Sequence, residues 1–220
     1  MVDYDYLRRL PFWDHLSDSE KELVEANSMI NKYSKGQMIY NSDVECSGIM
    51  MVLTGELRMS IMSEEGREIT LYRLYENELC ALTAACILEQ ITFDTQTTVT
   101  EDCAVLIVNT YTFEKLMNGN IHVRCFMYEL LSERFSSVVW TMQMILFKKY
   151  DCRLASFLIN EYEQTGDRII KMTHDEIAQY TNSAREVVAR MLKRFANDGL
   201  LEFKRGKIIL LDIQALKEIV

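Results

Sequence analysis

Two helix-capping patterns stand ten residues apart in the last third of the chain, and together they constrain the fold more than any other feature. Each is a Ser or Thr followed three residues later by Glu: Thr173 with Glu176, and Ser183 with Glu186. In such a capping box, the two side chains bond free backbone N–H groups at a helix start. The first helix has room for about two turns before Thr181-Asn182, and the second ends at Asp198-Gly199. The sequence therefore predicts two short helices joined by a tight turn.

The second of these helices is amphipathic. Its apolar face consists of Val187, Val188, Met191, Leu192 and Phe195. The opposite face is polar and charged, which is typical of a helix-turn-helix whose second helix enters the DNA major groove. Because arginine can donate a bidentate pair to guanine and glutamate can accept from cytosine, we expect Arg185, Glu186 and Arg190 to contact bases. The alternative is a solvated helix face stabilised by a Glu186–Arg190 pair.

A basic hairpin follows this helix. The stretch LLEFKRGKIILL reads as two short apolar strands around Lys204-Arg205-Gly206-Lys207, which is the pattern of a DNA-binding wing. Basic and hydroxyl side chains suit the phosphates beside a reading helix. We expect six residues to contact the DNA backbone: Thr173, Ser183, Lys193, Lys204, Arg205 and Lys207.

The net charge of −9 does not exclude DNA as a partner, because the acidity is confined to one part of the chain. Residues 1–150 hold 13 Lys+Arg and 22 Asp+Glu, whereas residues 151–220 hold 11 of each. Electrostatic contacts with phosphates act within about 8–10 Å, so a DNA-binding protein needs a local basic surface and not a positive net charge.

The region from Tyr33 to about Val108 has the pattern of antiparallel strands. Short apolar or alternating runs are separated by glycines: Gly36, Gly48, Gly55 and Gly66. Glu64-Glu65-Gly66-Arg67 predicts a hairpin tip. We expect a sandwich or small barrel here, preceded by a helical lead-in at residues 4–32 that has Ser17 and Glu20 as a capping box and Ile30 on its apolar stripe.

A long helix of about 25 residues is predicted from about Ile121, because apolar residues recur every three or four positions as far as Leu146. This apolar stripe is broader than one domain needs. A second copy of the helix would cover it in a two-fold dimer; the alternative is packing within one chain. The residues expected in the dimer contact are Phe126, Leu130, Phe135, Val138, Met142 and Ile145.

Over essentially its whole length the chain resembles the Crp/Fnr family, the cyclic-AMP receptor protein and fumarate-nitrate regulators. The resemblance is carried by PFWDHLSDSEKELV, by GIMMVLTGELRMSIMSEEGREITLYRL, by the long helix through Val139 and by THDEIAQYTNSAREVVARMLKRFANDGLLEFKRG. It implies an α+β fold with a cyclic-nucleotide-binding-like β-roll (jelly roll), a dimerisation helix and a winged helix-turn-helix. We place these at residues 1–116, 117–147 and 148–220.

The resemblance also implies an effector in the β-roll and a two-fold symmetric DNA site. In the cyclic-AMP-binding members, a trio like Arg185, Glu186 and Arg190 reads a TGTGA-type half-site. Whether the protein activates or represses does not follow from these residues.

The expected effector pocket departs from that of the cyclic-nucleotide binders, which hold ribose and cyclic phosphate with a Gly-Glu motif and an Arg-Ser pair. Here Thr83 stands where the glutamate is expected, and Phe93-Asp94 where the Arg-Ser pair is expected. Asp94 would repel the anionic phosphate, so we do not expect cyclic AMP to bind. The residues expected around the pocket are Cys80, Leu82, Thr83, Cys86, Phe93, Asp94 and Thr95.

Other sensor chemistries are weakly supported, and the effector stays unknown. No cysteine precedes Cys46, so we do not expect the N-terminal iron–sulfur cluster of other members. A haem would need an axial ligand, and His122, the one histidine near the sensor–helix junction, is by itself weak evidence. Cys80 and Cys86 suit a thiol switch or a soft metal, although buried cysteines more commonly act as small hydrophobes. An apolar or aromatic ligand is a further alternative, and no metal site is assigned.

Two competing classes fit less well. A cupin-like enzyme gathers histidines and carboxylates around a metal, and residues 33–115 contain no histidine, so no catalytic site is expected. A protein-interaction module without DNA binding has no use for a capped helix-turn-helix and a basic wing. With no apolar run of about 18 residues, no signal-peptide core and no C-x-x-C pair, we expect a reduced, cytoplasmic protein that does not contact membranes. Its expected partners are double-stranded DNA, a second copy of itself and, for an activator, RNA polymerase.

Overall fold

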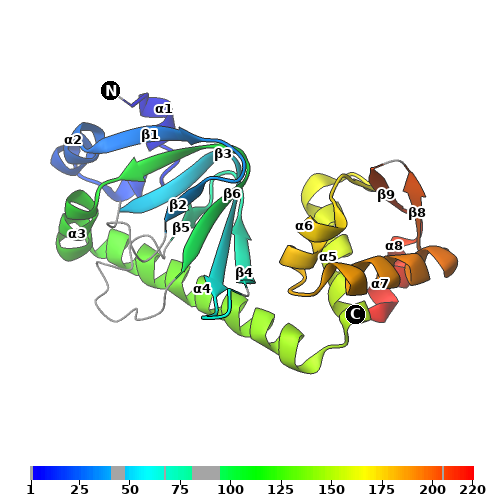
Figure 1. Cartoon of the computed structure of the whole chain (residues 1–220). Coiled ribbons are helices and arrows are strands. Elements are labelled where there is room, and N and C mark those ends of the chain that lie inside the picture. Colours follow the sequence, from blue (N-terminus) through cyan, green and yellow to red (C-terminus); the bar gives the residue numbers. More distant parts are fainter. Residues whose placement is uncertain (1, 41–47, 67, 81–94, 205) are drawn as a thin grey trace. The chain divides into compact units, whose positions relative to one another are not determined.

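The computed structural model describes residues 2–40, 48–66, 68–80, 95–204 and 206–220. The chain forms two compact units, and the main division between them falls inside one long helix, between Val139 and Trp140. An N-terminal β-roll, the long helix and a C-terminal winged helix-turn-helix are all present (Figure 1), so the predicted α+β fold is confirmed. In the part of the chain that is described, no helix is long and apolar enough to cross a lipid bilayer.

The N-terminal unit begins with three short helical segments. These are α1 (Tyr4–Leu7), the 3-10 turn η1 (Trp13–His15) and α2 (Asp18–Ala26). The predicted capping box at the start of α2 is confirmed, because the Ser17 backbone N–H donates to the Glu20 carboxylate at 2.7 Å. Burial raises the pKa of Glu20, but hydrogen bonds from Ser17 and Asn120 outweigh it and the net pKa is lowered.

The helical lead-in predicted for residues 4–32 is wrong at its C-terminal end. Helix α2 ends at Ala26, and residues Ser28–Tyr33 form strand β1, which pairs antiparallel with residues 103–108. Ile30 lies at helical spacing from the apolar residues of α2, but its backbone pairs with Leu106. Backbone pairing with residues 103–108 therefore outweighs the helical spacing of apolar residues at this position.

The sheet of the roll is built around two long strands. The strands are β1 (Ser28–Tyr33), β2 (Met38–Tyr40), β3 (Ile49–Met62), β4 (Glu68–Leu74), β5 (Leu79–Cys80) and β6 (Gln96–Val108). Their order is β1-β6-β3-β4, with β2 also paired to β6 and β5 to β3. The pairing of β3 with β6 shifts between Val52 and Leu57. Gly55 has a φ of 82° there, and a side chain at this position would clash with the Asp102 carbonyl.

Two apolar clusters fill the first unit. One joins the N-terminal segments to α3 (Thr110–Gly119) and to the first part of α4 (Ile121–Phe147), and it includes Phe12, Phe113 and Met127. The other lies within the sheet and includes Met59, Tyr72, Cys80 and Val105. Val138 of α4 packs against this second cluster. Helix α4 is therefore part of the core of the roll.

The C-terminal unit has its own core. Its elements are α5 (Tyr150–Thr165), β7 (Ile169–Ile170), α6 (His174–Tyr180), α7 (Arg185–Asn197), β8 (Leu201–Lys204), β9 (Lys207–Leu210) and α8 (Ile213–Ile219). Buried side chains from the helices and the hairpin, such as Leu158, Ile177, Leu192 and Ile208, pack together. The hairpin β8–β9 projects beside α7 (Figure 1).

Candidate functional site

The first predicted capping box of the helix-turn-helix is confirmed. The Thr173 hydroxyl oxygen accepts a hydrogen bond from the Glu176 backbone N–H at 3.1 Å, and the Glu176 carboxylate accepts one from the Thr173 backbone N–H at 2.8 Å. The hydroxyl also donates to this carboxylate at 3.0 Å. A phosphate contact by the Thr173 hydroxyl, which we predicted, would therefore compete with the cap.

The turn between α6 and α7 sets the direction of α7. The Thr181 hydroxyl donates to the Ile177 carbonyl at 2.7 Å, and the Ser183 backbone N–H donates to the Ala178 carbonyl at 2.9 Å. Between them Asn182 has a φ of 52°, a left-handed conformation that asparagine adopts more readily than most residues. The turn is thus held against the end of α6.

The second predicted capping box, Ser183 with Glu186, is wrong. Helix α7 begins at Arg185, and its N-cap residue is Ala184, which has no side-chain acceptor. Ser183 lies one residue too early, because its backbone N–H is bonded back to the Ala178 carbonyl of α6. Burial raises the pKa of Tyr150, and the bonds from Thr181 and Ser183 offset part of that rise. The phosphate contact by Ser183 stays a prediction.

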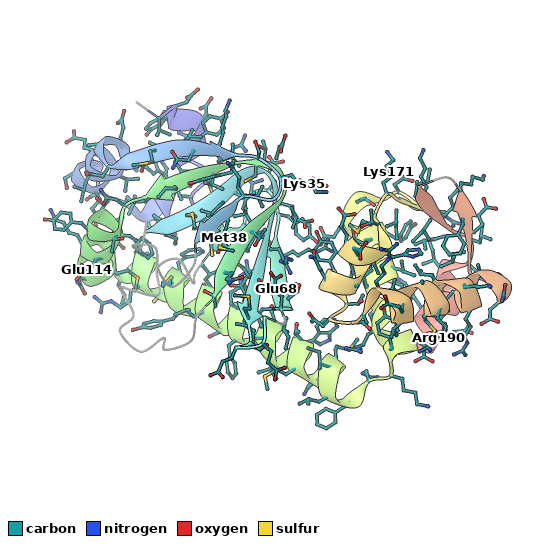
Figure 2. All side chains as sticks on the ribbon, in the orientation of Figure 1. Lys35, Met38, Glu68, Glu114, Lys171 and Arg190 are labelled. Atoms are coloured by element: carbon teal, nitrogen blue, oxygen red, sulfur yellow. The ribbon has the colours of Figure 1, made fainter. Side chains whose placement is uncertain are left out.

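Helix α7 has one buried and one exposed face. Val188, Leu192 and Phe195 are buried in the core of the unit. The exposed face carries all the side chains predicted to read bases, together with one predicted phosphate contact: Arg185, Glu186, Arg190 and Lys193. Figure 2 shows Arg190 on the outer side of α7. The structure therefore brings the predicted base-reading residues together on the first two turns of one helix.

The Arg185 side chain is held by a carboxylate that the sequence prediction missed. Its Nη1 lies 3.4 Å from Asp175 Oδ2, and both side chains are 63% exposed. Exposed pairs of this kind contribute little stability, so Arg185 is oriented but free to exchange partners. An acidic residue in the first turn of α6, ten residues before Arg185, is the signal that was available.

The wing presents its lysines to solvent. Lys204 and Lys207 are exposed and face each other across the hairpin, and Lys204 also contacts Glu202 at 3.0 Å. Gly206 has a φ of 70°, which allows the tight turn. Arg205 lies outside the described residues. The ring of Phe203 packs edge-on against His174 at 6.3 Å between centroids, a contact from the wing to α6 that the sequence did not indicate.

The residues of α4 that were predicted to form the dimer contact do not all lie on one face of the helix. Leu130 is only 6% exposed in the core of its own chain, and Phe126 packs against the same core. Phe135 and Met142, by contrast, are 71% and 53% exposed. A set of exposed or half-buried residues recurs at alternating spacings of three and four: Tyr128, Leu131, Phe135, Val138, Met142 and Ile145.

Only part of the predicted effector pocket is described. Cys80 and Thr95 are buried, and the Cys80 thiol donates to the Met59 sulfur at 3.8 Å. The other predicted pocket residues, Leu82, Thr83, Cys86, Phe93 and Asp94, lie outside the described residues. No group of three or more His, Cys, Asp or Glu side chains able to hold a metal is found within the described ranges.

An open depression of about 360 Å³ lies elsewhere on the roll. It is lined by Lys32, Tyr33, Ser34, Thr54, Asp102, Cys103 and Ala104, none of which was predicted to bind an effector. Burial, together with the charge of Asp102, raises the pKa of Cys103 to about 11, so this thiol is a poor nucleophile near neutral pH.

Both halves of the chain match known domain families. Residues 152–219 match the Crp-like helix-turn-helix domain, and residues 30–120 match the cyclic nucleotide-binding domain.

Individual relatives agree with these domain matches. The chain is 37% identical to a solved transcriptional regulator of the Crp/Fnr family from Eubacterium rectale, over 96% of this chain and 98% of that one, with a TM-score of 0.89. It is 30% identical to the transcriptional regulator SdrP of Thermus thermophilus, but over only 40% of this chain and about half (47%) of that protein. It is 22% identical to the cyclic AMP receptor protein of the same organism, over 95% and 96% of the two chains.

Proposed function

Because the chain belongs to the Crp/Fnr family of transcriptional regulators, we propose that it acts as a two-fold dimer that reads a palindromic DNA site through α7. The observation that carries the proposal is the exposure of Arg185, Glu186 and Arg190 together on the first turns of α7. Their spacing matches the trio by which cyclic-AMP-binding members read TGTGA-type half-sites, so we propose such a half-site here. Lys193, Lys204, Arg205 and Lys207 would contact the flanking phosphates.

The exposed face of α4 supports the dimer. Residues Tyr128, Leu131, Phe135, Val138, Met142 and Ile145 follow the seven-residue repeat of a two-stranded coiled coil. We name this set the α4 seam. Four of its members were predicted from sequence. Leu130 is buried in the core of the chain itself, and Phe126 packs against that core. The seam members Leu131 and Val138 also pack in part against apolar clusters of their own chain. A second α4 would remove Phe135 and Met142 from water, as no described part of the single chain does.

We propose that an effector bound in the β-roll controls DNA binding, and that this effector is not cyclic AMP. The cyclic AMP receptor protein of T. thermophilus is named for that ligand, but Thr83 and Asp94 replace the residues that the resemblance requires for it. Because α4 is packed against the roll through Val138 and continues to Phe147, a change at the roll can shift the equilibrium between two arrangements of the dimer.

Fluorescence anisotropy with a labelled TGTGA-type palindrome and a scrambled duplex, over a series of salt concentrations, tests the DNA reading. The protein is kept reduced throughout. We expect it to bind the palindrome more tightly than the scrambled duplex at physiological salt. Equal binding to both duplexes at every salt concentration would reject the proposed half-site.

Analytical ultracentrifugation tests the dimer. Phe135→Glu places a charge in the α4 seam and should give a monomer with weakened binding to the palindrome. Tyr111→Glu is the matched control, because Tyr111 is also an exposed aromatic residue, at 68%, but lies on α3. It should remain dimeric. A dimeric Phe135→Glu protein would reject the α4 seam.

A further inference from the structure

Among the buried donor atoms without a hydrogen-bond partner in the described part of the chain, two lie on side chains that contact each other. Tyr72 of β4 is only 9% exposed, and its hydroxyl has no hydrogen-bond partner there. Arg134 of α4 lies with its guanidinium carbon 5.1 Å from the centre of the Tyr72 ring. Its Nε–H is likewise buried without a partner. The two donors come from different elements, a strand and a helix, whose side chains contact each other here.

Such groups are uncommon, because a buried donor that loses water without gaining a protein partner is destabilising. Both atoms present a hydrogen, so the partner that would satisfy them is an acceptor. Burial raises the pKa of Tyr72 well above its usual range, with a further rise from Cys80, so the phenol keeps its proton near neutral pH. The nearby Cys80 thiol donates its hydrogen to the Met59 sulfur at 3.8 Å.

The charge around the two donors restricts the acceptor further. Glu78 lies 3.9 Å from Arg134 Nη2, and its side chain is 40% exposed, so it balances part of the guanidinium charge from the solvent side. Its contact is with Nη2, and Nε has no hydrogen-bond partner in the described part of the chain. A guanidinium that is half balanced in this way suits a single negative charge better than the two charges of a phosphate.

Apolar side chains also pack in the cluster that contains Tyr72. Met59 and Leu71 belong to the same buried cluster as Tyr72, and Val138 packs against it one helical turn beyond Arg134. Two adjacent donors match the two oxygens of a carboxylate, and the cluster matches an apolar body.

We infer that the roll takes a small organic carboxylate with an apolar body, whose oxygens accept from Arg134 Nε and the Tyr72 hydroxyl. The inference rests on the proposed function, since it names the class of the effector. Arg134 directly precedes Phe135 of the α4 seam, so a carboxylate bound there would pull on α4 at the dimer contact. A bound carboxylate would in this way affect DNA binding by α7, although the residues that hold a cyclic nucleotide in other family members are missing.

Isothermal titration calorimetry and thermal unfolding of the whole protein, without DNA, test the inference. The probes are acetate, isovalerate, benzoate and phenylacetate at up to about 10 mM, with benzamide as a neutral control and inorganic phosphate as a second anion, all at constant ionic strength. We expect the bulkier carboxylates to bind and to raise the Tm. Binding should weaken about tenfold or more in both Tyr72→Phe and Arg134→Gln.

The matched control is Tyr150→Phe, because the Tyr150 hydroxyl is bonded to Thr181 at 3.0 Å. Without ligand, Tyr72→Phe should leave the Tm unchanged or higher, since it removes an unsatisfied hydroxyl, whereas Tyr150→Phe should lower the Tm and leave carboxylate binding unchanged.

Three results would overturn the inference: benzamide or phosphate that binds as tightly as the best carboxylate, no measurable binding of any carboxylate, or undiminished carboxylate binding by Tyr72→Phe. Because these titrations contain no DNA, a protein that reads the palindrome but binds no carboxylate rejects this inference alone. Carboxylate binding without DNA binding would reject the proposed function instead.

Discussion

Arginines are held in opposite ways in the two units of this protein. In the roll, Arg73 lies 3.2 Å from Glu56, and both side chains are about nine-tenths buried. In the C-terminal unit, Arg185 lies 3.4 Å from Asp175, and both side chains are largely exposed. Removing one partner of the buried pair leaves a charge without water, whereas the surface pair exchanges readily with solvent. Similar ion-pair distances therefore belong to a fixed structural element in one unit and to an available recognition group in the other.

The largest expected effect is on the buried pair. Arg73→Ala should lower the free energy of unfolding by about 3–5 kcal/mol, because it removes the positive charge beside the buried Glu56 carboxylate, which still accepts a hydrogen bond from the Thr100 hydroxyl. Arg194→Ala, whose partners Asp151 and Asp198 are nearer the surface, should cost less than about 1 kcal/mol. Urea unfolding followed by circular dichroism measures both. Equal losses in the two variants would break the distinction.

The surface pair should affect recognition and leave the fold unchanged. Arg185→Ala should reduce discrimination at one G·C pair of the half-site by about 1–3 kcal/mol, with little change in Tm. Arg194→Ala removes an exposed arginine from the same helix and should leave the base preference intact. Fluorescence anisotropy on duplexes that differ in that base pair measures this discrimination. If Arg185→Ala discriminates as well as the natural protein, Arg185 does not read a base.

Glu20, on α2 of the N-terminal unit, should make the stability of that unit depend on pH. The net pKa of Glu20 is lowered in the folded protein, so its stabilisation is complete above the ordinary value of 4.5 and is lost as the pH falls through the lowered value. Glu20→Gln should therefore be less stable than the natural protein by roughly 0.5–1 kcal/mol near neutral pH. The difference should vanish in strong acid. Thermal unfolding across pH measures it, and a constant difference would contradict the assigned hydrogen bonds.

The smallest effect on stability is expected at the wing. Lys204 contacts Glu202 in solvent, so Lys204→Ala should change the free energy of unfolding by only a few tenths of a kcal/mol. Affinity should fall about equally for the palindrome and for scrambled DNA, and the slope of log affinity against log salt should decrease by about one per protomer. A loss confined to the palindrome would instead make Lys204 a base contact.

The elements that could be predicted from the sequence are those whose pattern is local. The cap of α6, the short turn and the amphipathic α7 each lie within a few residues of their signals. The start of α7 was misplaced because the bond from Ser183 to Ala178 delays the helix by one residue, and no spacing rule contains that bond. Strand β1 was missed because its partner, β6, lies some 75 residues away in the sequence.

The candidate sites show the same limit. A helical period marks which residues of α4 are apolar but not whether its own chain or a second copy covers them, so Leu130 was assigned to the dimer contact. Tyr72 and Arg134 are 62 positions apart on a strand and a helix, and neither has a motif around it. Only the folded roll brings them together.

The continuity of α4 also limits how genes for such a protein can change length. Its 27 residues form one uninterrupted helix of about 40 Å. Each residue added to a helix rotates everything beyond it by about 100°. One codon inserted after Phe135 would therefore turn Met142 and Ile145 off the α4 seam, although every side chain is retained. Seven codons would nearly restore the register. Natural insertions and deletions in this helix should accordingly accumulate in whole heptads, while the loops of the roll vary freely in length.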